Sequence, residues 1–191
     1  MTHERPIYLD NNATTPVDPR VLEAMLPYLR EDFGNAASRT HAYGWDAEKA
    51  VETGRRQVAE LLGAKPSEIV FTSGATESTN LALKGLFERH SGKRDGLVTA
   101  VTEHKATLDV AKHLEPQGAR VTRLGVDREG FIDLAQLAAS VDEHTLVVSI
   151  MAVNNESGVI QPLAEIGAIC ADRGAVFHCD IAQAFGKIPL D

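Results

Sequence analysis

The sequence predicts an α/β fold, with a mostly parallel sheet covered by helices on both faces. Short apolar segments alternate with helical patterns five times between Glu68 and Cys179, which is typical of strands joined by crossover helices. The apolar segments show little in–out alternation, as expected for strands that are buried on both faces. With 191 residues and 43% apolar content, the chain is long enough for one such domain.

Two helices are expected before this alternating region. Pro16 and Pro19 bracket the start of a helix over residues 20–29. Apolar residues recur at helical spacing over residues 43–62, and Gly63 is placed to end that second helix. We assign residues 1–16 to an amino-terminal segment and residues 17–191 to one large domain.

From residue 68 onward we expect five strands and four helices. The strands, each a short apolar run, cover residues 69–71, 97–101, 119–124, 146–153 and 176–179. The helices between them cover residues 76–89, 106–114, 134–139 and 163–172. Because the chain stops soon after the last strand, we expect the sheet to be incomplete at its carboxyl-terminal end.

Composition excludes several classes of protein. A formal charge of −8 without a basic run argues against a nucleic-acid partner. Cys170 and Cys179 form no CxxC and have no histidine at ligand spacing, so we expect no disulfide framework, no metal site and a reducing compartment. The first residues lack the order of a signal peptide, and no apolar run approaches a membrane span. We therefore expect a cytoplasmic protein with no membrane partner.

Polar groups follow the ends of several expected strands, where parallel sheets bind their ligands. Asp180 follows the last strand, and a buried carboxylate there needs a cation or hydrogen bonds. Gln183 offers an amide nearby. A helix cap or a surface salt bridge is the alternative role for Asp180.

The turn from Ser73 to Thr76 leads into a helix and contains two hydroxyls with a glycine between them. Free backbone N–H groups and the helix dipole make this turn a candidate phosphate site. Ser73 and Thr76 could also simply cap the helix, and the two roles are compatible. No P-loop lysine follows the turn, and no GxGxxG motif occurs in the chain.

His104 and Asn155 follow two further strands. His104 is either a structural histidine or a flat ring that stacks on a ligand and moves protons, and Asn155 either caps a turn or contacts the ligand. Taken together, the strand ends would suit a flat, phosphorylated, cationic heterocycle. Pyridoxal 5′-phosphate is such a molecule, and Asp180 would be the acid that keeps its ring nitrogen protonated.

Long motifs in a consistent order make the whole chain resemble the cysteine desulfurases, in the class V aminotransferase-like group with the type I pyridoxal-phosphate fold. The motifs are Ile7–Pro16, Phe33–Ser38 with His41 and Gly44, Ile69–Ser78, Thr102–Ala106, Val153–Gly158 and His178–Gln183. The resemblance implies the large domain of that fold, incomplete at its carboxyl-terminal end.

The resemblance also implies roles for the strand-end residues. Thr76, with the backbone of Gly74 and Ala75, would hold the cofactor phosphate. His104 would stack on the pyridine ring and take part in catalysis by moving protons.

Three further residues would contact the ring or the substrate. Asp180 would pair with the ring nitrogen, and Gln183 would hydrogen-bond the ring hydroxyl. Asn155 would contact either that hydroxyl or the substrate carboxylate.

Enzymes of this family convert L-cysteine to L-alanine and leave the sulfur as a persulfide on an enzyme cysteine. The branch that the chain most resembles supplies sulfur to iron–sulfur cluster assembly, through an acceptor such as a scaffold protein. Family members are homodimers, so we expect a homodimer when the protein is intact.

Two residues needed for that chemistry have no match in the chain. The family's Schiff-base lysine and acceptor cysteine lie later in its sequence, and Cys170 and Cys179 fit core positions better than a nucleophile. We therefore expect the 191-residue chain to be inactive alone. The alternatives are a selenocysteine lyase or another class V enzyme, or a short, non-catalytic scaffold or interaction protein.

Overall fold

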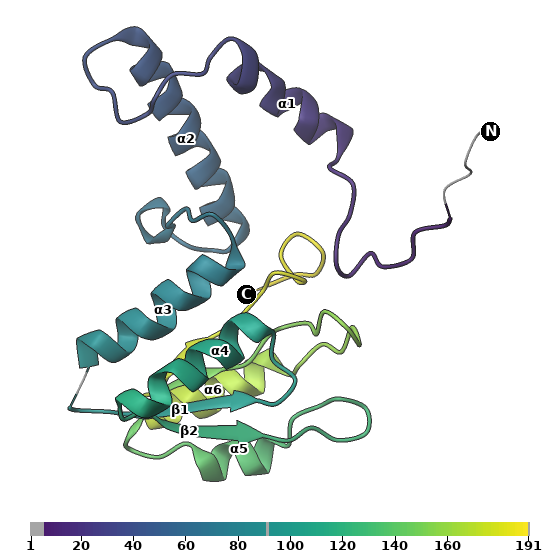
Figure 1. The fold of residues 1–191 in the computed structure, drawn as a ribbon, viewed down its shortest axis with the longest axis vertical. Coiled ribbons are helices and arrows are strands. Elements are labelled where there is room, and N and C mark those ends of the chain that lie inside the picture. Colours follow the sequence, from purple (N-terminus) through teal and green to yellow (C-terminus); the bar gives the residue numbers. More distant parts are fainter. Residues whose placement is uncertain (1–5, 91, 191) are drawn as a thin grey trace. The chain divides into compact units, whose positions relative to one another are not determined.

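The computed structural model describes residues 6–90 and 92–190. It divides into two compact units, one running to Phe71 and the other spanning Thr72–Pro189 (Figure 1). The assignment of residues 17–191 to a single domain stays a prediction. No helix in the described part of the chain is long and apolar enough to cross a membrane.

The first unit is helical. It contains α1 (Pro19–Arg30), α2 (Ala42–Leu61) and the short 3₁₀ helix η1 (Pro66–Glu68). Asp18 caps α1 by accepting a hydrogen bond from the Arg20 backbone at 2.8 Å. Gly63 follows α2 with a φ of 62°, a left-handed conformation that glycine adopts without steric cost. Both expected helices are confirmed to within two residues.

The expected strand over residues 69–71 is wrong. The segment pairs with no strand of the described chain, and Val70 and Phe71 are exposed. Arg55 holds the segment instead, because its guanidinium donates to the Ile69 carbonyl at 2.6 Å and lies 4.8 Å from the centre of the Phe71 ring. β-propensity alone does not make a strand without a neighbour to pair with.

The second unit is a four-stranded parallel sheet in the order β2-β1-β3-β4. Its strands are β1 (Gly96–Ala100), β2 (Arg120–Leu124), β3 (Thr145–Ser149) and β4 (Val176–His178). The central strands β1 and β3 are buried at every residue, whereas the edge strands β2 and β4 are partly exposed. The strand expected over residues 146–153 is shorter, because β1 ends at Ala100 and leaves that stretch with a neighbour on one side only.

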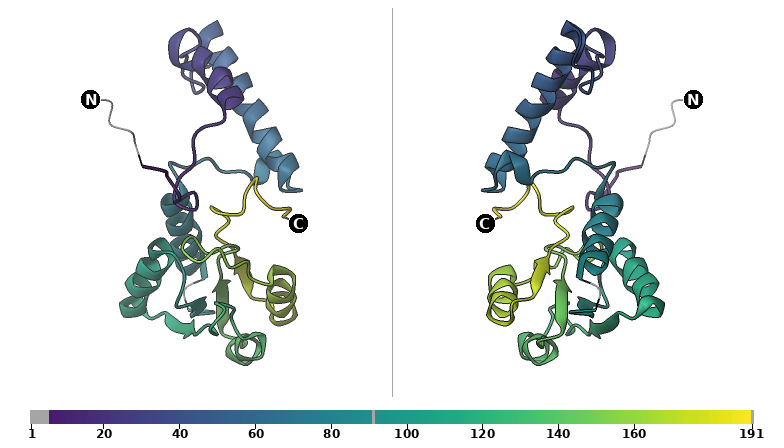
Figure 2. Two further views of the ribbon diagram at one scale, coloured as in Figure 1. Left: turned by 90° about the vertical axis from the view of Figure 1, so that its right-hand side faces the viewer. Right: turned by 90° about the vertical axis from the view of Figure 1, so that its left-hand side faces the viewer.

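Helices cover both faces of this sheet (Figures 1 and 2). α3 (Ala75–His90) and α4 (Lys105–Leu114), which continues into the 3₁₀ helix η2 (Glu115–Gln117), bury apolar residues against one face of β1 and β3. α5 (Leu134–Ser140) and α6 (Leu163–Arg173) cover the other face. The predicted α/β class, with a parallel sheet and helices on both faces, is confirmed.

The strand order reverses between β1 and β3. The chain leaves β1 through α4 to reach β2 on one side, and it then crosses by α5 to β3 on the other side. Loops that leave neighbouring strands toward opposite faces open a crevice at the carboxyl ends of those strands. The sheet topology therefore predicts a ligand site between the ends of β1 and β3.

Candidate functional site

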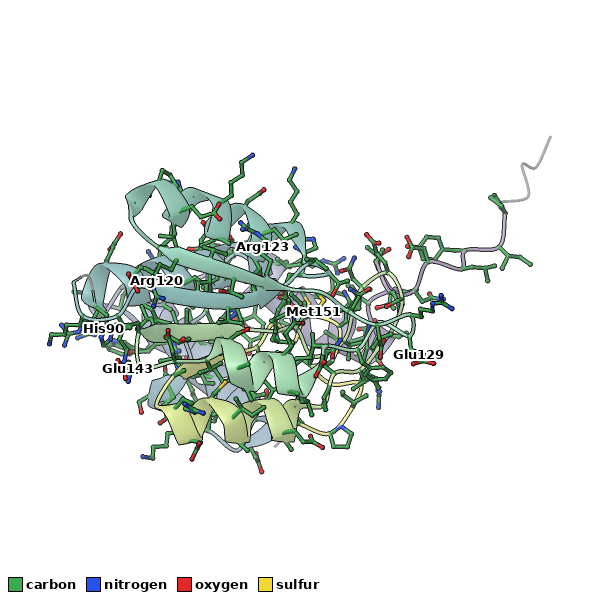
Figure 3. All side chains as sticks on the ribbon, turned by 90° about the horizontal axis from the view of Figure 1, so that it is seen from below. His90, Arg120, Arg123, Glu129, Glu143 and Met151 are labelled. Atoms are coloured by element: carbon green, nitrogen blue, oxygen red, sulfur yellow. The ribbon has the colours of Figure 1, made fainter. Side chains whose placement is uncertain are left out.

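An open pocket of about 650 Å³ lies at the carboxyl ends of β2, β1 and β3. Three loops line it, over residues 101–105, 126–130 and 154–157. His104 and Asn155 come from the two loops that flank the reversal of strand order. In Figure 3, Met151 and Glu129 lie toward this end of the strands, and His90 and Glu143 lie at the opposite end.

His104 caps a helix, which is the structural role considered for it, and it also lines the pocket. Its Nδ1 accepts a hydrogen bond from the Ala106 backbone at 3.2 Å and so caps α4. An accepting Nδ1 carries no proton, which means that the neutral ring carries its proton on Nε2. The side chain is exposed and lines the pocket, so the imidazole is anchored at one nitrogen and open at the other.

The loop after β3 is built by Asn154 rather than Asn155. The Asn154 amide nitrogen donates to the Thr102 carbonyl at 2.9 Å, which joins the loop to the end of β1. Its amide oxygen accepts from the backbone of Glu156 at 2.9 Å and of Ser157 at 2.8 Å. Because Asn154 caps the turn, the half-buried Asn155 beside it is left to face the pocket.

Glu103 is one of the residues that line the pocket, although it is only 5% exposed. Its Oε1 accepts from the Met151 backbone N–H at 2.7 Å, while its Oε2 has no hydrogen-bond partner among the described residues. Burial, together with the nearby charge of Asp180, raises the pKa of this carboxyl to about 8. The sequence prediction missed this group, although it follows a buried strand just as Asp180 does.

Asp180 and Gln183 follow β4, beyond the residues that line the pocket. The Asp180 carbonyl accepts from the Ala152 N–H at 2.9 Å, which fixes this chain end beside the end of β3. Its Oδ1 accepts from the Ala182 N–H at 2.9 Å, which is a local turn bond and not the helix cap considered as an alternative. The Gln183 side-chain oxygen accepts from the Lys187 ammonium at 3.2 Å.

The Ser73–Thr76 turn is exposed and opens α3. The backbone N–H and hydroxyl of Ser73 both donate to the Glu77 carboxylate, at 2.7 and 2.6 Å, and these bonds lower the pKa of Glu77. This turn can therefore bind a carboxylate, as expected of N–H groups at a helix N-terminus. Gly74, Ala75 and Thr76 lie outside the pocket lining.

Neither cysteine is suited to nucleophilic attack. Burial raises the pKa of the Cys170 thiol to about 11. Burial and the nearby Glu103 and Asp180 raise that of Cys179 to about 12. At neutral pH both are thiols rather than thiolates. Cys170 lies in the core as expected, whereas Cys179 is only half-buried.

Sequence comparison places the chain in a family. It matches the family Aminotransferase class-V over residues 7–191. The chain belongs to the class-V aminotransferase family. Enzymes of this family depend on pyridoxal phosphate, so the predicted cofactor class is confirmed at family level.

Individual relatives agree with this assignment. The chain is 56% identical to cysteine desulfurase IscS of Rickettsia felis over 186 residues, which cover 97% of the chain and 45% of that protein. A solved structure described as a NifS-like protein superposes with a TM-score of 0.93 at 44% identity, over 97% of this chain and 51% of that one. Another, described as SspA in complex with cysteine, superposes with a TM-score of 0.92 at 39% identity, over 96% and 53%.

These comparisons confirm the resemblance to cysteine desulfurases and the type I pyridoxal-phosphate fold. The chain spans about half the length of the relatives it matches. The roles assigned to individual site residues stay predictions.

The predicted site residues carry the kinds of chemical group that a pyridoxal-phosphate site needs. The imidazole of His104 and the amide of Asn155 share one pocket, and the second carboxylate oxygen of Asp180 makes no hydrogen bond within the described residues. The Ser73–Thr76 turn already binds an anionic group, the carboxylate of Glu77. The described chain therefore supplies a flat ring and an amide in the pocket, a carboxylate after β4, and an anion-binding turn at the start of α3.

Proposed function

We propose that this chain is the cofactor-binding portion of a cysteine desulfurase, a pyridoxal-phosphate enzyme that converts L-cysteine to L-alanine. The sulfur would remain as an enzyme-bound persulfide destined for iron–sulfur cluster assembly. The observation that carries the proposal is the pocket at the reversal of strand order, which His104 and Asn155 line from its two flanking loops. The names of the similar proteins support the choice of substrate, since one is a cysteine desulfurase and another was solved in complex with cysteine.

Within this proposal, the residues at the strand ends share the binding of the cofactor. Thr76 and the backbone N–H groups of Gly74 and Ala75 would hold the phosphate. They lie next to Ser73, which now binds the Glu77 carboxylate. Asp180 would face the ring nitrogen with its free oxygen.

Two amide side chains would complete the contacts. Gln183 would bond the ring hydroxyl after releasing Lys187. Asn155 would contact that hydroxyl or the substrate carboxylate. When bound, pyridoxal phosphate supplies an electron sink, because its protonated ring withdraws electrons from the α-carbon of the substrate.

His104 would stack on the ring and act as the proton-moving group. Its Nδ1 is occupied by the Ala106 N–H, so Nε2 is the atom that can give or take a proton. The same bond fixes the plane of the imidazole at the start of α4. A histidine held in this way could contact the substrate proton without losing its orientation.

The 191-residue chain alone is proposed to be inactive. None of its lysines matches the family's Schiff-base position, and the raised pKa values of Cys170 and Cys179 make neither a ready persulfide acceptor. The intact protein is proposed to be a cytoplasmic homodimer that passes sulfur to an iron–sulfur scaffold protein. The two free cysteines suit a reducing compartment.

The test is to purify the protein from its own source, measure its intact mass, and assay alanine and sulfide release from L-cysteine with pyridoxal phosphate. A mass near twice 20.6 kDa with alanine release is the expected result. A protein of that larger mass that binds the cofactor but acts on selenocysteine and leaves cysteine intact would refute the desulfurase proposal. A 20.6 kDa protein without activity would favour the scaffold role.

A further inference from the structure

Glu103 joins two strand ends, and no role has yet been given to it. It follows β1, and its Oε1 accepts from Met151 after β3. The charge of Asp180, which follows β4, raises the pKa of Glu103 further. It is only 5% exposed and has no part in the roles proposed above. A buried acid at this place needs a physical reason.

The backbone beyond β3 supplies that reason. Successive N–H groups of a strand point toward opposite neighbours, and those of Ile150 and Ala152 donate to the β4 side, to His178 at 3.1 Å and Asp180 at 2.9 Å. The N–H of Met151 between them points to the β1 side. There β1 has ended, so no β1 carbonyl is available, and Glu103 supplies the acceptor at 2.7 Å.

The surroundings of Glu103 favour its neutral form. No ion pair of the described residues includes it, and the titratable groups that face it are Asp180 and the thiol of Cys179. From α4 the hydroxyl of Thr107 faces it, and both that hydroxyl and Glu103 Oε2 are buried without a partner in the described chain. The hydroxyl can donate to Oε2 in either protonation state, and such a bond by itself lowers the pKa of Glu103. Burial outweighs it, and a proton on Oε2 removes the repulsion between Glu103 and Asp180.

We infer that Glu103 is a positioning residue: as a neutral acid it ties the loop that carries His104 to the end of β3, where the loop that carries Asn155 begins. This inference rests on the proposed cofactor site for its consequence, because the tie sets the spacing of the two pocket walls. A neutral Glu103 also adds no second negative charge beside Asp180. The residue acts through its neighbours and touches no reacting atom.

Two substitutions separate the effect of the hydrogen bond between Met151 and Glu103 from the effect of the charge on Glu103. Glu103→Gln keeps an acceptor for Met151 and is neutral at every pH, whereas Glu103→Leu has similar size and no acceptor. Glu143, exposed at the far end of the strands, provides matched controls as Glu143→Gln and Glu143→Leu. In the unsubstituted chain, a carboxyl ¹³C titration should place the pKa of Glu103 near 8 rather than near 4.5.

Amide hydrogen exchange tests the hydrogen bond between Met151 and Glu103 directly. In Glu103→Leu the Met151 amide should exchange about tenfold faster, as for loss of one hydrogen bond, while the Ile150 amide, bonded to β4, stays protected. Glu103→Gln and both Glu143 variants should leave Met151 protected. An unchanged Met151 rate in Glu103→Leu, or equal acceleration of Ile150, would overturn the inference.

Binding of pyridoxamine 5′-phosphate, which needs no lysine, tests the consequence in the same chains. Affinity should fall about tenfold in Glu103→Leu and stay within about twofold in Glu103→Gln. Equal losses in the two variants would show that a charged Glu103 is needed and would overturn the neutral form. If the unsubstituted chain itself binds none, the proposed cofactor site fails, while the Met151 exchange rates still decide the role of Glu103.

Discussion

Replacing Glu103 by glutamine should change how the stability of the chain depends on pH. Burial raises the pKa of Glu103 from 4.5 to about 8 in the folded state. Folding then favours the protonated acid, so its contribution is fully present below pH 4.5 and is lost as the pH rises through 8. Since one pKa unit corresponds to about 1.4 kcal/mol, the loss approaches about 5 kcal/mol by pH 9.

Glutamine cannot ionise, so Glu103→Gln should escape this loss. Urea unfolding followed by circular dichroism, from pH 5 to pH 9, would give both free energies. We expect the two chains to agree within about 1 kcal/mol near pH 5, and the variant to be the more stable by several kcal/mol at pH 9. Glu143→Gln should show no such divergence, because that side chain is 86% exposed. A difference between Glu103→Gln and the parent chain that stays constant across this pH range would refute the reasoning.

Three further substitutions test contacts that stabilise the sheet and its helices, and each is measured by urea unfolding at pH 7. Leu137→Ala removes a fully buried side chain of α5 and should lower the free energy of unfolding by about 3 kcal/mol. A decrease below about 1 kcal/mol would contradict the placement of Leu137 in the core. Arg94→Met removes charged donors to two backbone carbonyls and should cost about 2 kcal/mol, with exposed Arg128→Met as its neutral control. Asp133→Ala removes the N-cap of α5 and should cost about 1 kcal/mol, and Asp133→Asn should restore most of it.

The elements that could be predicted from the sequence are those with strong local signals. The buried strands β1 and β3 have apolar runs at their centres, and α2 keeps its helical period up to Gly63. Residues 69–71 carry the same apolar signal and form no strand. Their pairing depends on a neighbouring strand, which is a tertiary property that a three-residue pattern does not contain.

The candidate site could be predicted in part. The topology brings His104 and Asn155 into one pocket, as expected of strand ends in a parallel sheet. The local bonds of Asp180 and Gln183, to Ala182 and Lys187, could not be read from spacing. Glu103 was missed because its burial depends on where β1 ends relative to β3.

The residues of this site work in adjacent pairs. Glu103 is buried and bonded to the Met151 backbone, while His104 beside it is exposed and lines the pocket. Asn154 likewise bonds the end of β1 and its own turn, while Asn155 is left free. In each pair, one residue fixes its loop by hydrogen bonds, while the side chain of the next is available to a ligand. The position of each ligand-facing residue therefore depends on the hydrogen bonds of its neighbour, which is why Glu103 should matter to binding.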